Sequence, residues 1–267
     1  MARFGDYLLV RRLGDGSHGR SFLAEPPLRL GVSDEYVVLK VLHREVSDDD
    51  FARASDRLAT VASVLSPYLA RPLDVVRVER AIGVVTELVP GGALDAPARP
   101  IARREVMQAV ADAALGAHAL HETGIAHANI TPANILLGAR CSKLADASLL
   151  GVLDPGRTTA GVRAGDAVDL TDPAVLLGAA PSRASDVWSL GATLHRLLTG
   201  QSLFGVVPDV GETEALRHVI VAPARLGGSL APAEARIIAD CVADDPVERP
   251  LTAEALATRL RSLLLAA

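Results

Sequence analysis

The sequence has few cysteines, few aromatic residues and no long apolar run. Its two cysteines, Cys141 and Cys241, lie far apart, which excludes a disulfide framework and favours two small apolar core thiols in a reducing, cytoplasmic compartment. Aromatic residues make up only 3% of the chain, so leucine, valine and alanine must fill the core. No apolar run approaches the roughly 20 residues that cross a bilayer, and residues 1–6 lack the character of a signal peptide. We therefore expect a cytoplasmic chain without a membrane span.

The charge balance argues against nucleic-acid binding. Lys+Arg number 27 and Asp+Glu number 32, which gives a formal net charge of −5 and excludes a strongly basic nucleic-acid binder. With 49% hydrophobic and 22% charged residues, the composition is that of a globular chain of one or two compact units. Among the histidines only His118 and His121 are close, at i and i+3 of a predicted helix, and no third ligand is near them. We therefore expect a solvated helix face there and no metal site.

The first third of the chain is strand-like. Apolar and β-branched segments at residues 7–10, 21–24, 36–42, 73–76 and 82–85 predict an antiparallel sheet. One helix interrupts it, because residues 48–50 are three aspartates typical of a helix start. Its predicted apolar face ends before Pro67 and consists of Phe51, Leu58, Val61, Ala62 and Leu65.

The pattern changes to helices after residues 90–92 (PGG). Two helical stripes are predicted, one formed by Val106, Val110, Ala113, Ala114, Ala117 and Leu120, and one by Val187, Leu190, Leu194, Leu197 and Leu198. Between them, residues 151–183 are rich in loop-forming residues, and a loop of that length is usually functional or mobile. The second part of the chain is therefore predicted to be mainly helical.

Three motifs carry chemical information. The glycine-rich segment Gly14-Asp15-Gly16-Ser17-His18-Gly19 falls between two predicted strands, which argues against a dinucleotide-binding turn and leaves open a plain hairpin or a phosphate-binding loop, where glycine lets backbone amides approach closely. Lys40 ends the strand segment Val37–Lys40. Residues 86–92 (TELVPGG) and 127–137 (HANITPANILL) follow in that order.

In this order and context the motifs resemble the signature set of the protein kinase family in its bacterial Ser/Thr form. Three further segments agree, namely Ala145-Asp146-Ala147, Asp186–Gly191 and Asp245–Pro250, so the resemblance covers essentially the whole chain. It implies an α+β fold with two lobes. Residues 1–88 would form a small antiparallel sheet with a single helix, and residues 89–267 a larger, mainly helical lobe.

The resemblance also implies a site for ATP with Mg²⁺. In the family pattern the glycine-rich loop and the strand lysine hold the phosphates, two backbone positions bind the adenine edge, and an asparagine and an aspartate ligate the metal. The matching residues are Gly14, Gly16, Gly19 and Lys40, then Glu87 and Val89, then Asn134 and Asp146. Ser21 and Val38 depart from the residues that usually cover adenine, so we expect nucleotide binding to be weakened.

The catalytic loop departs most from the family. Asn129 stands where the family has the aspartate that accepts the substrate proton, and an amide cannot act as that base. Thr131 replaces a lysine that neutralises the transferring phosphate, and Ala128 replaces an arginine that binds a phosphorylated activation loop. General acid/base groups contribute roughly 10²–10⁴-fold in rate. The sequence therefore predicts a pseudokinase, with an active Ser/Thr kinase that uses a non-standard catalytic loop as the alternative.

A pseudokinase acts through a partner. We expect a protein partner from the same signalling system, namely an active kinase, a phosphatase or a phosphopeptide-reading domain, and no nucleic acid.

Two charge positions also depart from the family. Asp172 precedes Pro173 where the family has a glutamate after its proline, so Arg249 has lost its usual partner, and we expect Asp172 or another acid to compensate. On the small-lobe helix, either Asp56 or Arg57 occupies the position facing Lys40. A shift of one residue turns a helical side chain by about 100°, and the sequence leaves this choice open.

Overall fold

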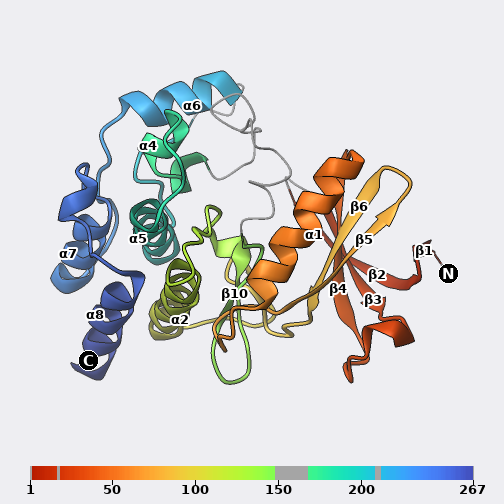
Figure 1. Cartoon of the computed structure of the whole chain (residues 1–267). Coiled ribbons are helices and arrows are strands. Elements are labelled where there is room, and N and C mark those ends of the chain that lie inside the picture. Colours follow the sequence, from red (N-terminus) through yellow and green to blue (C-terminus); the bar gives the residue numbers. More distant parts are fainter. Residues whose placement is uncertain (1, 17–18, 148–167, 208–211, 267) are drawn as a thin grey trace. The chain divides into compact units, whose positions relative to one another are not determined.

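The computed structural model describes residues 2–16, 19–147, 168–207 and 212–266, and it separates into two compact units (Figure 1). The described part of unit 1 falls in Met1–Leu65 and Ala70–Leu88. Unit 2 takes Ser66–Leu69 and the described remainder from Val89 onward. Each unit is described by itself below.

Unit 1 is a six-stranded antiparallel sheet with one long helix. The strands pair in the order β1-β2-β3-β4-β6-β5. Their bounds are β1 Arg3–Phe4, β2 Tyr7–Gly16, β3 Gly19–Glu25, β4 Val37–Glu45, β5 Pro72–Val78 and β6 Ala81–Glu87, and the helix is α1 Asp48–Ala62. The predicted sheet and helix are confirmed.

The two faces of this sheet bury different apolar clusters. One consists of Val46, Ala54, Leu58, Ile82 and Val84, joining α1 to the sheet, and the other of Tyr7, Ala24, Val37, Leu39, Val76 and Val85. Successive side chains of a strand point to opposite faces, and directly paired residues share a face. Lys40 pairs with Val84, so Lys40 lies on the face that α1 covers, while Leu39 lies on the opposite face.

The start of α1 is fixed by a reciprocal cap. The Ser47 hydroxyl accepts a hydrogen bond from the N–H of Asp50 at 3.1 Å, and the Asp50 carboxylate accepts one from the N–H of Ser47 at 3.2 Å. Such a capping box satisfies two of the helix's unpaired N–H groups. The aspartates read from the sequence as a helix start therefore lie in its first turn.

The end of α1 differs from the prediction. The helix ends at Ala62, which is exposed, and Leu65 is 95% exposed and lies beyond the helix. The N–H of Val64 bonds the carbonyl of Val61 at 3.1 Å, which tightens the last turn. The residue before a proline also disfavours helical angles, so the chain leaves the helix ahead of Pro67. The expected contributions of Ala62 and Leu65 to the buried face were wrong.

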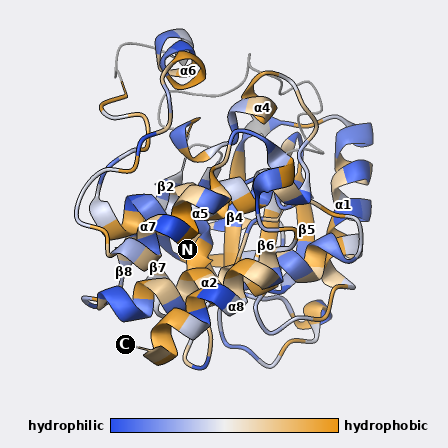
Figure 2. Cartoon of the chain, turned by 90° about the vertical axis from the view of Figure 1, so that its left-hand side faces the viewer, coloured by the Kyte–Doolittle hydropathy of each residue, from blue (hydrophilic) through white to orange (hydrophobic). Residues whose placement is uncertain are grey.

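Unit 2 is mainly helical with a small sheet. The helices are α2 Arg103–His121, α4 Pro173–Leu176, α5 Arg183–Thr199, α6 Glu212–Val221, α7 Pro232–Cys241 and α8 Ala253–Ala266. The short strands β7 Gly92–Ala93, β8 Ala96–Pro97, β9 Ile135–Leu136 and β10 Lys143–Leu144 pair in the order β10-β9-β7-β8. Figure 2 shows hydrophilic and hydrophobic residues interspersed along α2 and α8, as expected for helices with one buried face.

The centre of unit 2 is formed by α2 and α5. The predicted α2 stripe is buried along its length, and in α5 Val187, Leu190 and Leu194 are buried. A Cβ added at Gly191 would lie 2.5 Å from the Cβ of Cys241, so this glycine lets α5 and α7 pack closely. Among the described residues, no helix is long and apolar enough to span a membrane.

These elements confirm the predicted fold class, an α+β chain with an antiparallel sheet first and a helical part after it. Residues 151–167 of the predicted loop-rich stretch lie outside the described residues. The rest of that stretch contains the 3₁₀ turn η4 Val168–Leu170 and the helix α4.

Candidate functional site

The loop at residues 127–129 is fixed by a buried carboxylate. Asp186, at the start of α5, is 1% exposed and accepts hydrogen bonds from the N–H groups of His127 at 2.6 Å and Ala128 at 2.8 Å. His121 of α2 contacts the same carboxylate, with 2.8 Å between its Nε2 and Asp186 Oδ2. The loop is therefore held jointly by two core helices.

This carboxylate supports a strained backbone. Ala128 has φ = 63°, and a non-glycine residue in this region costs of order 1–3 kcal/mol and persists only where its surroundings fix it. The hydrogen bond from its N–H to Asp186 supplies that constraint.

His121 corrects the expectation of a solvated helix face. It is 4% exposed and paired with Asp186, which is 65 residues away in sequence. The partner is invisible to local spacing, although His121 follows Ala117 by four residues and so continues the buried stripe of α2. His118 is half-buried, with 3.6 Å between its Nε2 and a carboxylate oxygen of Glu254.

His127 links the loop to the segment before Asp146. Its Nε2 lies 2.9 Å from the carbonyl oxygen of Ala145, and its Nδ1 accepts the N–H of Asn129 at 3.3 Å. Both contacts are satisfied by the neutral ring that carries its proton on Nε2. Complete burial lowers the pKa of His127 below its ordinary value, so the ring stays neutral and acts as a structural link.

Asn129 is half-buried and is held through its main chain. Its carbonyl oxygen accepts a hydrogen bond from Nδ2 of Asn134 at 2.8 Å. Because Nδ2 of Asn134 makes this bond, Oδ1 is the atom of that amide that remains for a cation. The Asn129 side chain is itself a carboxamide, which has no basic oxygen able to take a proton.

A hairpin brings Asn134 next to the segment of Asp146. Strands β9 and β10 pair Ile135 with Leu144, and the N–H of Ala145 donates to the carbonyl of Asn134 at 2.8 Å. Asp146 is the next residue, with φ = 61°. The amide of Asn134 and the carboxylate of Asp146 therefore start from the same end of one hairpin.

This pair fits Mg²⁺ that arrives with phosphates. Magnesium takes oxygen ligands and is usually held by one or two protein groups together with phosphates and water. Within the described ranges no group of three or more His, Cys, Asp or Glu residues could hold a metal alone. Asn134 and Asp146 would thus be partial ligands, completed by a nucleotide.

The three glycines of the glycine-rich segment lie on the paired strands β2 and β3, where Gly14 pairs with Ser21 and Gly16 with Gly19. A Cβ at Gly19 would lie 2.4 Å from the carbonyl oxygen of Val41, so the fold itself needs this glycine. A Cβ at Gly14 would meet nothing within 4 Å, and its backbone is outside the left-handed region. The fold does not require glycine at Gly14, which suits a loop whose backbone a ligand approaches.

The helix α1 carries a partly buried cation. Arg57 is half-buried, whereas Asp56 is exposed, and Arg57 adjoins the buried Leu58 and follows Ala54 by three residues. Burial lowers the pKa of Arg57 below its ordinary value. Of the two alternatives left open by the sequence, Arg57 is the more buried side chain, and which of the two faces Lys40 stays a prediction.

Glu87 ends β6 and is tied to the segment before β5. Its N–H donates to the carbonyl of Arg71 at 3.0 Å, and its carboxylate accepts the N–H of Arg71 at 2.7 Å. Glu87 belongs to unit 1 and the buried Val89 to unit 2. The predicted site residues thus divide between the units, with Gly14, Gly16, Gly19, Lys40 and Glu87 in unit 1 and Val89, Asn129, Asn134 and Asp146 in unit 2.

The expected compensation for Arg249 is confirmed. Its Nη1 lies 2.5 Å from Oδ2 of Asp172, and the two side chains are 2% and 4% exposed. Asp172 also accepts the N–H of Ala174 at 3.0 Å and so caps α4. One carboxylate therefore neutralises the buried guanidinium and starts a helix.

A sequence profile described as the protein kinase domain matches residues 7–260. Serine/threonine-protein kinase PkaB of Streptomyces coelicolor is 29% identical over 97% of this chain and 63% of its own length. DNA damage-responsive serine/threonine-protein kinase RqkA of Deinococcus radiodurans is 29% identical over 95% of this chain and 39% of its own. Serine/threonine-protein kinase PknJ of Mycobacterium tuberculosis is 30% identical over 92% of this chain and 43% of its own. The chain thus spans less than two thirds of the length of these relatives.

Proposed function

The chain belongs to the protein kinase domain family, and from that premise we propose that it is a pseudokinase, a regulatory or scaffolding domain that transfers little or no phosphate. It would bind ATP with Mg²⁺ weakly and act by holding a protein partner within a Ser/Thr kinase signalling system.

The observation that carries this proposal is the combination of an intact loop scaffold with a missing base. Asp186 holds the backbone of residues 127–128, and Asn134 holds the carbonyl of Asn129. The side chain presented at Asn129 is nevertheless an amide, and Thr131 supplies no positive charge. Losing a general base costs roughly 10²–10⁴-fold in rate, and the missing cation removes further stabilisation of the developing charge.

Retention of a nucleotide site is supported by Lys40. Only two of the chain's 27 Lys and Arg residues are lysines, Lys40 and Lys143. A lysine placed by chance among the basic positions would rarely fall on the one strand position where the family holds phosphates. The open space at Gly14 and the shared hairpin end of Asn134 and Asp146 support the same site. When bound, Mg²⁺ would neutralise the phosphate charge at Asn134 and Asp146.

The proposed partners follow from the lack of chemistry. A domain that transfers no phosphate affects signalling by binding, and an active kinase, a phosphatase or a phosphopeptide-reading domain are the partners that such a system offers. The relatives named above carry serine/threonine-protein kinase names, which supports the assignment to that kind of system.

Phosphate transfer from labelled ATP to a generic protein substrate tests the proposal. We expect no transfer above background by the unaltered chain, and a gain of at least about 100-fold in a variant that combines Asn129→Asp with Thr131→Lys. The matched control combines Asn129→Ala with Thr131→Lys and should stay inactive. Substantial transfer by the unaltered chain that Asp146→Asn abolishes would overturn the proposal.

The second candidate is an active kinase with a non-standard catalytic loop. Asn134 beside Asp146 keeps this alternative open, because the same two side chains would hold Mg²⁺ with ATP in an active kinase and in a domain that only binds nucleotide. The assay above separates the two functions, and a thermal-shift titration with ATP and Mg²⁺ on the unaltered chain and on Lys40→Ala reports nucleotide binding independently of transfer.

A further inference from the structure

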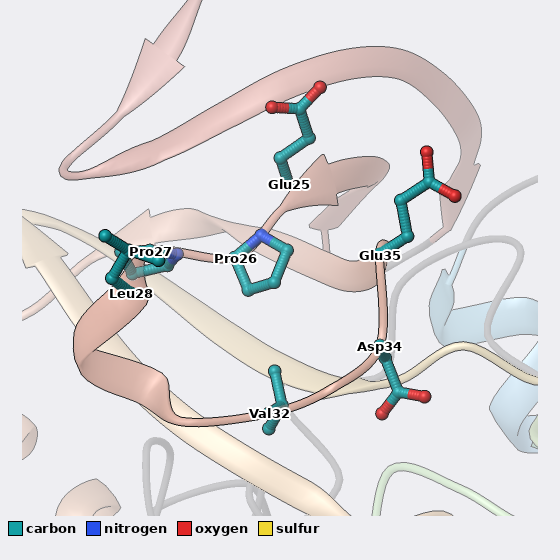
Figure 3. A pocket seen from close by; sticks show the side chains of 7 residues that line it. All are labelled: Glu25, Pro26, Pro27, Leu28, Val32, Asp34 and Glu35. Carbon is teal, nitrogen blue, oxygen red and sulfur yellow. The ribbon is translucent and has the colours of Figure 1, made fainter.

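A pocket opens on unit 1 at the connection between β3 and β4, away from the glycine-rich turn. It has a volume of about 460 Å³ and is lined by Pro26, Pro27, Leu28 and Val32 together with three carboxylates, Glu25, Asp34 and Glu35 (Figure 3). Strand β3 runs from Gly19 to Glu25, so about 20 Å of strand separates the two features. The volume lies within the range of about 300–1,000 Å³ that is usual for ligand pockets.

The backbone in the wall of this pocket is restricted at several residues. It contains the 3₁₀ turn η1 Leu28–Leu30, which follows two prolines with restricted backbones and closes at Gly31 with φ = 62°. The N–H of Gly31 donates to the carbonyl of Leu28 at 3.2 Å. Val32 packs against the apolar cluster that contains Tyr7 and Leu39. A preformed wall spares a ligand the cost of ordering it.

Arg29, the one cation of this turn, is held elsewhere. It donates to Asp6 at 2.6 and 3.0 Å and to Asp74 at 2.8 Å, and its guanidinium lies over the ring of Tyr7. It therefore anchors the turn to the sheet and does not neutralise the carboxylates of the pocket.

The pocket is negatively charged. Asp34 has Arg71 at 3.7 Å, with both side chains exposed, and in Figure 3 its carboxylate turns away from Glu25 and Glu35. Glu25 and Glu35 rise on the same side of the loop in that view, and no Lys or Arg of the described chain forms an ion pair with either of them. Such a site favours a cation and repels phosphate or an acidic peptide.

The apolar part of the wall narrows the choice of ligand. Leu28 is fully exposed, and Pro26, Pro27 and Val32 are partly exposed. A leucine in this position loses water contact only when a partner side chain covers it, which contributes about 25 cal/mol per Å² of apolar area. A metal ion would leave this surface uncovered. An isologous second copy would bring two sets of three carboxylates together.

We propose that this pocket is a docking site for a basic, apolar segment of a partner protein, with an Arg or Lys between Glu25 and Glu35 and an aliphatic side chain on Leu28. The inference rests on the proposed function, since a domain that acts by binding needs a surface for its partner, and it gives the chemistry of that partner.

The test uses the full chain and two capped five-residue peptides, one alternating leucine or valine with arginine and one with glutamate in place of arginine. Fluorescence anisotropy of the labelled peptides gives the affinity. We expect the arginine peptide to bind with a Kd of about 1 mM or tighter, the glutamate peptide not to bind, and Glu25→Gln with Glu35→Gln to weaken binding at least about 10-fold. The matched control, Asp49→Asn with Glu79→Gln, removes two exposed charges elsewhere in unit 1 and should bind as the unaltered chain does.

Three results would overturn the proposal: equal binding of both peptides, no binding of the arginine peptide, or equal weakening in the control variant. A dimer in sedimentation that Leu28→Asp dissolves would assign the surface to a second copy of this chain and would also overturn it. Failure of the proposed function would appear separately, as phosphate transfer by the unaltered chain. We expect the Glu25→Gln with Glu35→Gln variant to leave the result of that assay unchanged.

Discussion

Replacing Asp172 by alanine should destabilise unit 2 strongly, because it leaves a buried positive charge without its counterion. The Arg249 side chain is 2% exposed, and its other partners are carbonyl oxygens, including those of Ala243 at 2.8 Å and Ala184 at 3.1 Å. Breaking a buried pair by removing one partner costs about 3–5 kcal/mol, and the lost cap of α4 adds about 1 kcal/mol. The ion-pair loss alone corresponds to a fall in Tm of about 6–20 °C.

Fluorescence gives a local measurement of this effect. Trp188 is the only tryptophan and lies in α5 of unit 2, so its emission during urea unfolding reports the unit that contains the pair. Asp172→Asn should be milder than Asp172→Ala, since its remaining oxygen can still cap α4. Combining Asp172→Ala with Arg249→Met should recover much of the loss because no charge is then left buried. The reasoning is refuted if Asp172→Ala unfolds within about 1 kcal/mol of the unaltered chain, or if the double variant is no more stable than the single one.

Three further outcomes are expected. Asp186→Ala should lower the free energy of unfolding by about 3 kcal/mol or more and weaken ATP–Mg²⁺ binding in calorimetry, because the loop loses its anchor; unchanged nucleotide affinity would contradict the second effect. Burial raises the pKa of the Cys241 thiol to about 12, so a thiol reagent at pH 8 should label the half-buried Cys141 first, and Cys241 only on unfolding, as counted by mass spectrometry. Hydrogen bonds from Arg99 and the backbone lower the pKa of Glu105 from 4.5 to about 2. The contribution of Glu105 to stability is therefore present above pH 4.5 and is lost as the pH falls toward 2. In acid titrations, the difference in unfolding free energy between the unaltered chain and Glu105→Gln should vanish over that range.

The sequence predicted the elements well because their signals are local. The alternation that buries Leu39 and half-exposes Lys40 is a property of one strand. The stripe that buries Val187, Leu190 and Leu194 is likewise a property of one helix. The prediction for Leu65 was wrong because hydrophobic periodicity extends a helix up to the next proline. In the structure the last turn closes earlier, with the hydrogen bond from the N–H of Val64 to the carbonyl of Val61.

Contacts between distant segments were predictable only where charge had to balance. Arg249 demanded an acid, and Asp172 was the candidate offered by the motif, 77 residues away. No such charge requirement predicts the contact between His121 and Asp186, because a histidine can be buried in its neutral form or exposed. The pocket at Glu25 was also missed. Its lining comes from one short connection whose two prolines and three acids indicate a loop, and the space they enclose depends on how that loop folds back.

Unit 2 contains features that lower its folding stability, and they lie in and beside the loop of residues 127–129. Buried polar networks often cost stability relative to apolar residues of the same volume, and Ala128 and Asp146 adopt left-handed backbone angles that a glycine would adopt with less strain. A helical core needs neither feature in order to fold. Asp186 and His127 nevertheless hold this loop beside Asp146, and the side chain that the loop carries at Asn129 is a carboxamide. What the molecule maintains is therefore the shape of this loop and its position beside Asp146, which agrees with the proposal of a domain that binds nucleotide or a partner without transferring phosphate.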